Sequence, residues 1–210
     1  MVRAFIDSNV IANWILVNAR YREINKIEDE TESEKELKRF EEKLKKYPYQ
    51  KNSYDFLQHL SKNKHNYVFF VSQLVLNEVF SVILEEYVAK KLIAEGIPIR
   101  FWSKDWKQYK EKTQLPNEYS VDIVNGINNF IDTFLDEPII YAKEKYDRKS
   151  IVEFIIGFKC DTHDASICAI AIANKCKYLI TEDSRLRDQL KKCEIIKLMS
   201  SEEFRLKFFK

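Results

Sequence analysis

The last third of the chain alternates short apolar runs with segments of helical pattern. We predict helices at 162–175, 184–191 and 201–208, and strands at 178–181 and 194–198 between them. Strands that alternate with helices are typical of a parallel sheet, because each helix returns the chain across a face of the sheet. This alternation indicates the α/β class of folds.

The first half of the chain adds two strands to this frame. The apolar runs at 2–6 and 67–71 are rich in strand-forming residues, and each is followed by a segment of helical pattern. Ser72 is suited to cap the helix predicted at 73–94. We expect an open, mostly parallel twisted sheet of about four to five strands with helices on both faces.

The remaining segments predict helical additions to a single domain that spans residues 1–210. Insertions are expected at about 20–66 and 97–158, and neither contains a repeat or a low-complexity linker. Within the first insertion, Leu37, Phe40 and Leu44 recur at helical spacing among dense charges, so an exposed amphipathic helix is expected there.

The composition sets few limits on function. The formal net charge is +2, which neither supports nor excludes binding to nucleic acid. The four cysteines lack the C-x₂-C spacing of structural zinc sites, so we expect buried free thiols in a reducing cytoplasm. The opening residues lack the apolar core of a signal peptide, and no run of about 18 uncharged apolar residues predicts a membrane span. We therefore expect a cytoplasmic protein.

Three acidic residues interrupt segments that are otherwise free of charge. Asp7 is the only charged residue between positions 4 and 19, and Glu78 is the only one between positions 67 and 84. Asp164 is alone between positions 162 and 174 when a neighbouring histidine is set aside. A bare buried carboxylate costs several kcal/mol, so each acid is expected to be paired, hydrogen-bonded or bound to a metal.

The predicted elements bring four acids to one edge of the sheet. Asp7 ends the first strand and Asp183 follows a later one, while Glu78 and Asp164 lie in the first two turns of their helices. Ligands of open parallel sheets bind beyond the carboxyl ends of the strands. Four carboxylates gathered there repel one another, and Mg²⁺ or Mn²⁺ is the natural counter-charge because hard divalent cations prefer oxygen ligands. We predict a catalytic metal site formed by Asp7, Glu78, Asp164 and Asp183.

Each acid also has a structural explanation when it is taken alone. Asp7 could cap a helix, and Glu78 could pair with a lysine in the core. Asp164 could be a first-turn acid favoured by the helix dipole, and Asp183 could be a turn residue. Asp161 has a structural explanation of the same kind. These explanations are unrelated to one another, whereas a common site accounts for the acids together.

Three further features have no defined place in this site. Zinc is disfavoured because no His or Cys is grouped with all four acids. His163 is the one candidate, but it is next to Asp164 and adjacent residues of a helix face different directions, so it is left outside the site. Glu182 adds an acid without an assigned role. Aromatic residues at 101–109 could stack nucleic-acid bases, but a small packed core explains them as well.

Three segments carry these acids in a recognisable order. The first strand and Asp7 after it lie in FIDSNVI. The end of the second strand and the helix with Glu78 lie in VSQLVLNEVF. HDASICAIAIANKCKYLITEDSRL carries the last two acids. Together they resemble the PIN-domain family of metal-dependent ribonucleases, over about residues 1–16, 67–88 and 160–198. The remaining segments exceed a minimal member of that family.

The resemblance implies an endoribonuclease that hydrolyses RNA with Mg²⁺ or Mn²⁺ and leaves a 5′-phosphate. It assigns catalytic and metal-binding roles to the four predicted acids. Accessory roles go to four of their neighbours: Ser8, Asn9, Asp161 and Thr181. It fits either a toxin held silent by an antitoxin-like inhibitor protein or an RNA-processing nuclease, and it is compatible with a homodimer. The sequence does not identify the residues that bind RNA.

Two alternatives to a ribonuclease stay open. An aspartate-nucleophile phosphatase would need a second aspartate two residues after Asp7, where this chain has Asn9. A non-catalytic RNA- or protein-binding module of the same fold would not need all four acids, yet all four are present. The presence of the four acids favours an enzyme.

Overall fold

A single sheet of parallel strands organises the part of the chain that the computed structural model describes, residues 2–62, 67–97, 117–135 and 138–209. Within these ranges the strand order is β3-β2-β1-β4-β5. The strands are β1 (Val2–Ile6), β2 (Tyr67–Val71), β3 (Ile139–Tyr141), β4 (Tyr178–Ile180) and β5 (Lys197–Met199). Since the strands are parallel, their carboxyl ends share one edge of the sheet, here called the C-terminal rim.

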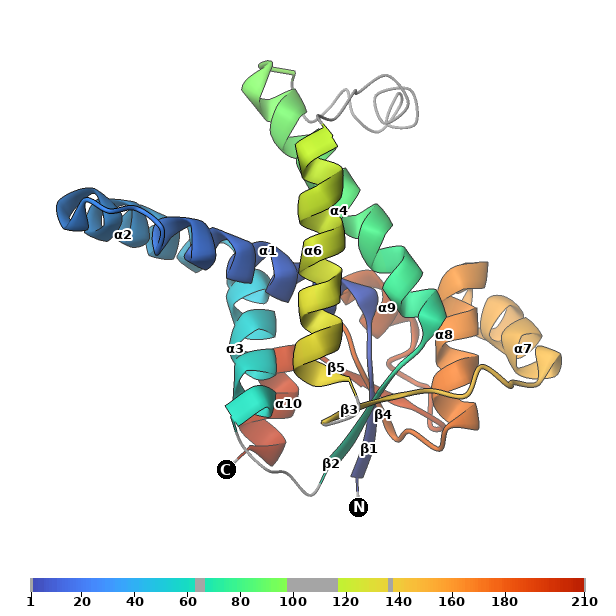
Figure 1. The fold of residues 1–210 in the computed structure, drawn as a ribbon. Coiled ribbons are helices and arrows are strands. Elements are labelled where there is room, and N and C mark those ends of the chain that lie inside the picture. Colours follow the sequence, from blue (N-terminus) through green and yellow to red (C-terminus); the bar gives the residue numbers. More distant parts are fainter. Residues whose placement is uncertain (1, 63–66, 98–116, 136–137, 210) are drawn as a thin grey trace.

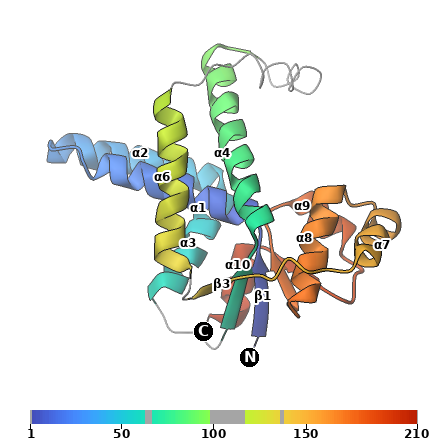
Figure 2. The same ribbon diagram turned by 45° about the vertical axis from the view of Figure 1, so that its right-hand side comes forward.

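Helices cover both faces of the sheet, as Figures 1 and 2 show. The described helices are α1 (Ser8–Ile24), α2 (Glu30–Lys46), α3 (Pro48–Lys62), α4 (Gln73–Ala94), α6 (Asn117–Phe134), α7 (Arg148–Phe158), α8 (Thr162–Ala173), α9 (Ser184–Gln189) and α10 (Ser201–Phe208). Helices α3 and α10 lie on one side of the sheet, and α7 and α8 lie on the other. Two helix pairs, α1 with α2 and α4 with α6, project away from the sheet. The expected α/β fold with a parallel sheet and helices on both faces is confirmed.

Aromatic side chains fill the core between the sheet and α3 and α10. Phe56, Phe69 and Phe204 are fully buried, and the ring of Phe56 lies 5.7 Å from that of Phe69 and 5.9 Å from that of Phe204. Burial of such side chains is the main force that holds helices onto a sheet. The core therefore fixes the central strands, whose ends carry the predicted acids.

Most predicted elements occur where the sequence placed them. The strands at 2–6 and 67–71 and the helices at 73–94 and 201–208 agree with the structure at both ends. The hydroxyl of Ser72 accepts a hydrogen bond from the Val75 N–H, as expected of a helix cap. The last strand occupies Lys197–Met199 instead of 194–198. Strand β3 was not predicted, and it lies within 97–158, so that segment is not helical throughout.

The remaining expectations meet different outcomes. Helices α2 and α3 occupy most of 20–66, where a helical addition was expected. The four cysteines are free, and three of them are buried. None of the described helices is long and apolar enough to cross a membrane. The aromatic residues Phe101, Trp102, Trp106 and Tyr109 lie outside the described residues.

Candidate functional site

Asp7 lies at the centre of the C-terminal rim. Its N–H donates to the Ile180 carbonyl at 3.0 Å, so the pairing of β1 with β4 continues up to this residue. Its carboxylate caps α1, because Oδ1 accepts a hydrogen bond from the Ser8 N–H at 2.8 Å. Oδ2 accepts from Asn9 Nδ2 at 2.9 Å and from the Thr181 hydroxyl at 2.7 Å. The side chain is thus both a helix cap and a fixed acid at the end of a central strand.

Thr181 connects the first and the last acid of the predicted set. Its hydroxyl donates to Asp7 Oδ2 and accepts from the Asp183 N–H at 3.0 Å and from Asn9 Nδ2 at 3.0 Å. A hydroxyl group offers one donor and two acceptor positions, so all three are used. Thr181 is fully buried, and these bonds fix the loop after β4 against the end of β1. The accessory positions Ser8, Asn9 and Thr181 therefore act by holding Asp7.

The carboxyl group of Asp7 is held in surroundings that disfavour its charge. Asp7 is 5% exposed. The pKa of Asp7 is raised to about 6: burial is the largest cause and the negative charges of Glu78 and Asp183 add to it, while the hydrogen bonds from Thr181 and Ser8 oppose the rise. The hydrogen bonds thus do not fully compensate the buried charge, and a nearby cation would stabilise it.

Two aspartates lie at the start of α8. Asp161 caps this helix, because its Oδ1 accepts a hydrogen bond from the Asp164 N–H at 2.9 Å. The side chain of Asp161 is 55% exposed, whereas that of Asp164 is only 14% exposed. The pKa of Asp164 is raised to about 7, mainly by burial and also by the negative charges of Asp161, Asp7 and Asp183. Asp164 is therefore near to the other acids and poorly solvated.

Asp183 begins the neighbouring helix. It caps α9 with Oδ1, which accepts from the Leu186 N–H at 3.0 Å, so Oδ2 is left for other partners. Three of the acids, Asp7, Asp161 and Asp183, are therefore helix caps. The structural explanation holds for each of these caps, and yet the caps also lie together.

Arg185 stands among these carboxylates. Its Nη2 atom is 3.4 Å from Asp164 Oδ2, 3.5 Å from Asp161 Oδ2 and 3.9 Å from Asp183 Oδ2. The guanidinium charge opposes the rise in the pKa of Asp164 but does not cancel it. Arg185 is not among the residues predicted from the sequence, because an arginine among dispersed charges gives no signal until the fold brings its partners together.

Glu78 faces a histidine. Its Oε2 atom lies 3.1 Å from His163 Nε2, which connects the second turn of α4 to the first turn of α8. His163 was expected to face a different direction from Asp164 and was left outside the site. It does face a different partner from Asp164, but that partner is the predicted site residue Glu78, because α4 approaches α8 from the side to which His163 points.

The five carboxylates of Asp7, Glu78, Asp161, Asp164 and Asp183 are here called the acid cluster. Their oxygen atoms suit a hard divalent cation, and burial with mutual repulsion leaves negative charge uncompensated. Among the described residues, however, no three Asp, Glu, His or Cys side chains are grouped closely enough to ligate one metal ion. The donor set fits Mg²⁺ or Mn²⁺ in its chemistry, whereas Asp161, Asp164 and Asp183 are directed towards Arg185 and Glu78 towards His163.

Glu182 has a structural role. Its Oε1 atom accepts a hydrogen bond from the Ser201 N–H at 2.9 Å, at the start of α10. Its own N–H donates to Asn9 Oδ1 at 3.0 Å. Glu182 therefore connects two loops of the C-terminal rim.

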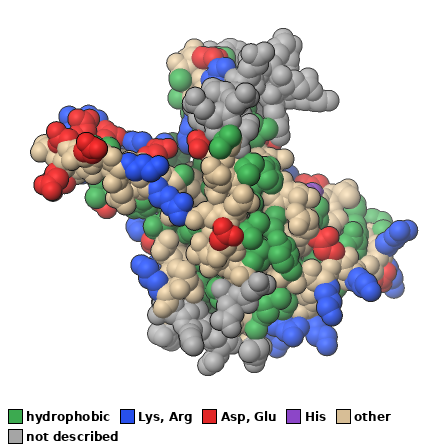
Figure 3. Space-filling model, in the orientation of Figure 1, with side chains coloured by type: hydrophobic (Ala, Val, Ile, Leu, Met, Phe, Trp, Pro, Cys, Tyr) green, Lys and Arg blue, Asp and Glu red, His purple; other side chains and the backbone are tan. Residues whose placement is uncertain are grey.

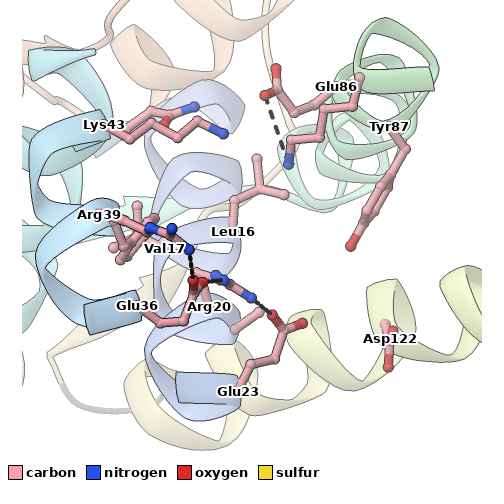
Figure 4. Close-up of a pocket in the computed structure, with 14 residues that line it drawn as sticks. Leu16, Val17, Arg20, Glu23, Glu36, Arg39, Lys43, Glu86, Tyr87 and Asp122 are labelled. Atoms are coloured by element: carbon pink, nitrogen blue, oxygen red, sulfur yellow. Dashed lines mark hydrogen bonds and ion pairs between the residues drawn. The ribbon is translucent and has the colours of Figure 1, made fainter. Parts of the chain in front are cut away.

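A separate pocket lies between the projecting helices, and its volume is about 460 Å³ (Figure 4). Arg20 crosses one side of it, paired with Glu23 at 2.9 Å and with Glu36 at 2.7 Å. Four basic and four acidic side chains line it: Arg20, Arg39, Lys43, Lys90, Glu23, Glu36, Glu86 and Asp122. None of the predicted site residues lines this pocket. Its charges balance, so the pocket favours no ligand of a particular charge.

Comparison with known proteins gives little guidance on function. No family model matches the chain. An uncharacterized protein of Archaeoglobus fulgidus is 28% identical over 117 residues, which are 56% of this chain and 86% of that protein. The chain is thus similar to a protein without an assigned activity, and the ribonuclease resemblance stays a prediction.

Proposed function

We propose that the chain is a metal-dependent endoribonuclease of the PIN-domain type, and that the acid cluster is its active site. The observation that carries the proposal is the gathering of carboxylates from four separate segments at the C-terminal rim, with Asp7 buried and Asp164 largely so. The pKa of Asp7 rises to about 6 and that of Asp164 to about 7, by burial and by the charges of the other acids. Uncompensated charge of this kind is typical of functional sites, because a structural role is better served by a paired or neutral group.

The residues of the chain have distinct tasks in this reaction. A divalent cation, when bound to these oxygens, would polarise the phosphodiester and lower the pKa of a bound water. Asp7 is held in place by Ser8, Asn9 and Thr181, so its oxygens are fixed before substrate arrives. Asp164 would help to hold the cation or would accept the proton of the attacking water.

Positive side chains for RNA are available in the segment between β3 and α7. Lys143, Lys145 and Arg148, here called the rim cations, are exposed in the segment that leads from the carboxyl end of β3 into α7. Two acids of that segment are used internally, since Glu144 accepts from the Leu74 N–H and Asp147 caps α7. Figure 3 shows Lys and Arg side chains gathered around α7 and at the lower right of the molecule. Such charges would bind the phosphate backbone of RNA without reading its sequence.

One observation favours the non-catalytic alternative. Four of the five acids of the cluster are directed towards Arg185 or His163, an arrangement that a binding module without chemistry could keep permanently. Binding of RNA without cleavage would support that alternative. An inhibitor protein and a second copy of the chain stay predictions from the family resemblance.

A cleavage assay tests the proposal directly. Labelled single-stranded and structured RNAs are incubated with the protein in Mg²⁺, in Mn²⁺ and in EDTA. We expect cleavage with either metal ion, none in EDTA, and products that carry a 5′-phosphate. Asp7→Asn and Asp164→Asn should each lower the rate by about 100-fold or more, since each removes a charge aimed at the reacting centre.

A matched control separates the cluster from charge in general. Asp188→Asn removes an exposed acid of α9 that lies outside the cluster, and it should cleave at the wild-type rate. Equal cleavage by wild type, Asp7→Asn and Asp164→Asn would refute the assigned roles. RNA bound by wild type but never cut, with any of the metal ions, would favour the binding module.

A further inference from the structure

The side chain of Arg185 places a positive charge inside the acid cluster. One nitrogen atom, Nη2, lies 3.4–3.9 Å from carboxylate oxygens of three acids, Asp161, Asp164 and Asp183. Two of these three are also predicted metal ligands. The same oxygens cannot serve a divalent ion and the guanidinium at short distance, because two cations held that close repel each other.

The helix that carries Arg185 does not explain its position. Arg185 is the second residue of α9, and a helix start favours acidic side chains over basic ones. The guanidinium turns back across the cap residue Asp183 towards the start of α8, where Asp161 and Asp164 lie. The acids of the cluster therefore account for its placement, and the local helix does not.

The contacts of Arg185 are loose. Charge-assisted hydrogen bonds between guanidinium and carboxylate are typically about 2.7–2.9 Å long, and all three distances here are longer. The Arg185 side chain is 64% exposed, so it loses little when it moves back into water. Exposed pairs of this kind stabilise weakly, which makes the guanidinium easy to displace.

Asp164, by contrast, has little access to water that could compensate its charge. The Asp164 side chain is 14% exposed, and Asp7 behind it is 5% exposed. Among the described residues, the ion pairs join Asp164 to Arg185 alone. Asp164 therefore needs a nearby cation, which is Arg185 when no metal ion is bound.

We infer that Arg185 is a tethered counter-cation: it partly offsets the charges of Asp161, Asp164 and Asp183 in the metal-free protein and competes with the divalent ion for them. The inference rests on the proposed function, since it assumes that the cluster binds such an ion. It explains why the acids are not grouped as metal ligands, because Arg185 draws three of them towards its own nitrogen. Loading with metal then requires the guanidinium to leave.

Binding of Mn²⁺ alone, without RNA, tests the inference. Titration calorimetry or the electron paramagnetic resonance of free Mn²⁺ gives the Kd of wild type and of Arg185→Gln. We expect Arg185→Gln to bind Mn²⁺ about fivefold more tightly, since three weak ion pairs no longer oppose the metal. Arg185→Lys keeps the charge and should stay within about twofold of wild type.

Arg187→Gln is the matched control for a general loss of positive charge. Arg187 lies in the same helix but pairs with Glu203 at 3.5 Å, outside the cluster, so its removal should leave the Kd unchanged. Circular dichroism spectra and melting temperatures in EDTA verify that each variant is folded. If Arg185→Gln fails to fold, Arg185→Ala and Arg185→Met repeat the titration.

The outcomes separate this inference from the proposed function. An unchanged or weaker Mn²⁺ affinity in the folded Arg185 variants, with Mn²⁺ bound by wild type, overturns the competition and leaves the nuclease proposal standing. A gain of equal size in Arg187→Gln also overturns it, since the effect would then be one of overall charge. Absence of Mn²⁺ binding in every protein overturns both proposals.

Discussion

Asp7 and Asp164 carry similar buried charges in unequal surroundings. Asp7 accepts hydrogen bonds from Ser8, Asn9 and Thr181, whereas the side chain of Asp164 has only the loose contact with Arg185. Replacing Asp7 by Asn therefore disturbs several hydrogen bonds, whereas replacing Asp164 by Asn removes mainly a charge. The two variants should both lose activity but should differ in stability.

We predict that Asp164→Asn is more stable than wild type in EDTA at about pH 8, by about 1 kcal/mol, because an uncompensated buried charge is removed. Asp7→Asn should be less stable by about 1–3 kcal/mol, because its new N–H₂ group must face a hydrogen-bond donor. Urea denaturation of both variants in EDTA measures these changes. Equal destabilisation of the two would show that the charge of Asp164 is well compensated in the fold.

At the scale of residues, the sequence predicts which acids matter but not what they contact. Asp7, Glu78 and Asp164 stand out because they interrupt apolar segments, and this pattern depends only on chain order. The contacts of Arg185 with α8 and of His163 with α4 join residues that lie far apart in the sequence. Periodicity and spacing carry no information on such contacts, since they depend on how helices approach one another.

The two projecting helix pairs meet by close packing at Gly126. A Cβ atom at this position of α6 would lie 2.5 Å from Ile15 Cγ2 of α1, which is a rigid, buried side chain. Trp14 adds to the same contact, with its ring 5.1 Å from that of Phe134. The small residue thus allows α6 to approach α1.

Gly126→Ala should therefore lower the free energy of unfolding by about 1–2 kcal/mol, although alanine favours helix by about 1 kcal/mol over glycine. Thermal or urea unfolding of the variant measures the change. In an Ile15→Ala background the same substitution should be neutral or stabilising, since the overlap is gone. Stabilisation of the otherwise unchanged protein by Gly126→Ala would contradict the packing described for α1 and α6.

The segment between β3 and α7 makes a prediction about RNA. Replacing Lys143 and Lys145 together by Ala should raise KM for RNA about tenfold at low salt and leave kcat unchanged, because these side chains would contact phosphate rather than the scissile bond. The slope of the logarithm of the binding constant against the logarithm of salt concentration should become shallower by an amount equal to about two phosphate contacts. Lys38→Ala with Lys45→Ala, two exposed lysines of α2, is the control and should change neither value. A drop in kcat alone would place the rim cations elsewhere in the reaction.

At the scale of elements, the sequence predicts long or strongly patterned segments well and short edge strands poorly. The strands at 2–6 and 67–71 are five residues long and apolar, and both were predicted at their true ends. Strand β3 has only three residues, two of which are exposed, so its pattern is too short to identify. Strand β5 is also three residues long at the other edge, and its apolar neighbours Ile195 and Ile196 shifted the prediction.

For the molecule as a whole, the acid cluster makes stability depend on pH. Asp7 and Asp164 have pKa values of about 6 and about 7 in the folded protein, above their ordinary value of 3.8. The folded state therefore holds more protons than the unfolded chain between about pH 4 and pH 7, and this part of the stability is lost as the pH rises. The ionised acids therefore destabilise the metal-free protein near neutral pH.

We predict that, in EDTA, the stability of wild type relative to Asp164→Asn falls as the pH rises from about 5 to about 8. Millimolar Mg²⁺ should restore the stability of wild type at the higher pH, because bound metal stabilises the charged acids, and should leave Asp164→Asn nearly unchanged. Melting temperatures of both proteins across this pH range provide the measurement. A wild-type curve that runs parallel to that of the variant would show that Asp164 does not titrate as described.

A crystal of the protein soaked in Mn²⁺ tests the central claim most directly, since anomalous scattering locates the ion without reference to activity. We predict an anomalous peak bound to oxygens of Asp7, Glu78, Asp164 and Asp183, directly or through water, with the Arg185 guanidinium turned away from Asp164. A peak elsewhere, or none at the C-terminal rim under conditions in which the protein cuts RNA, would contradict the account.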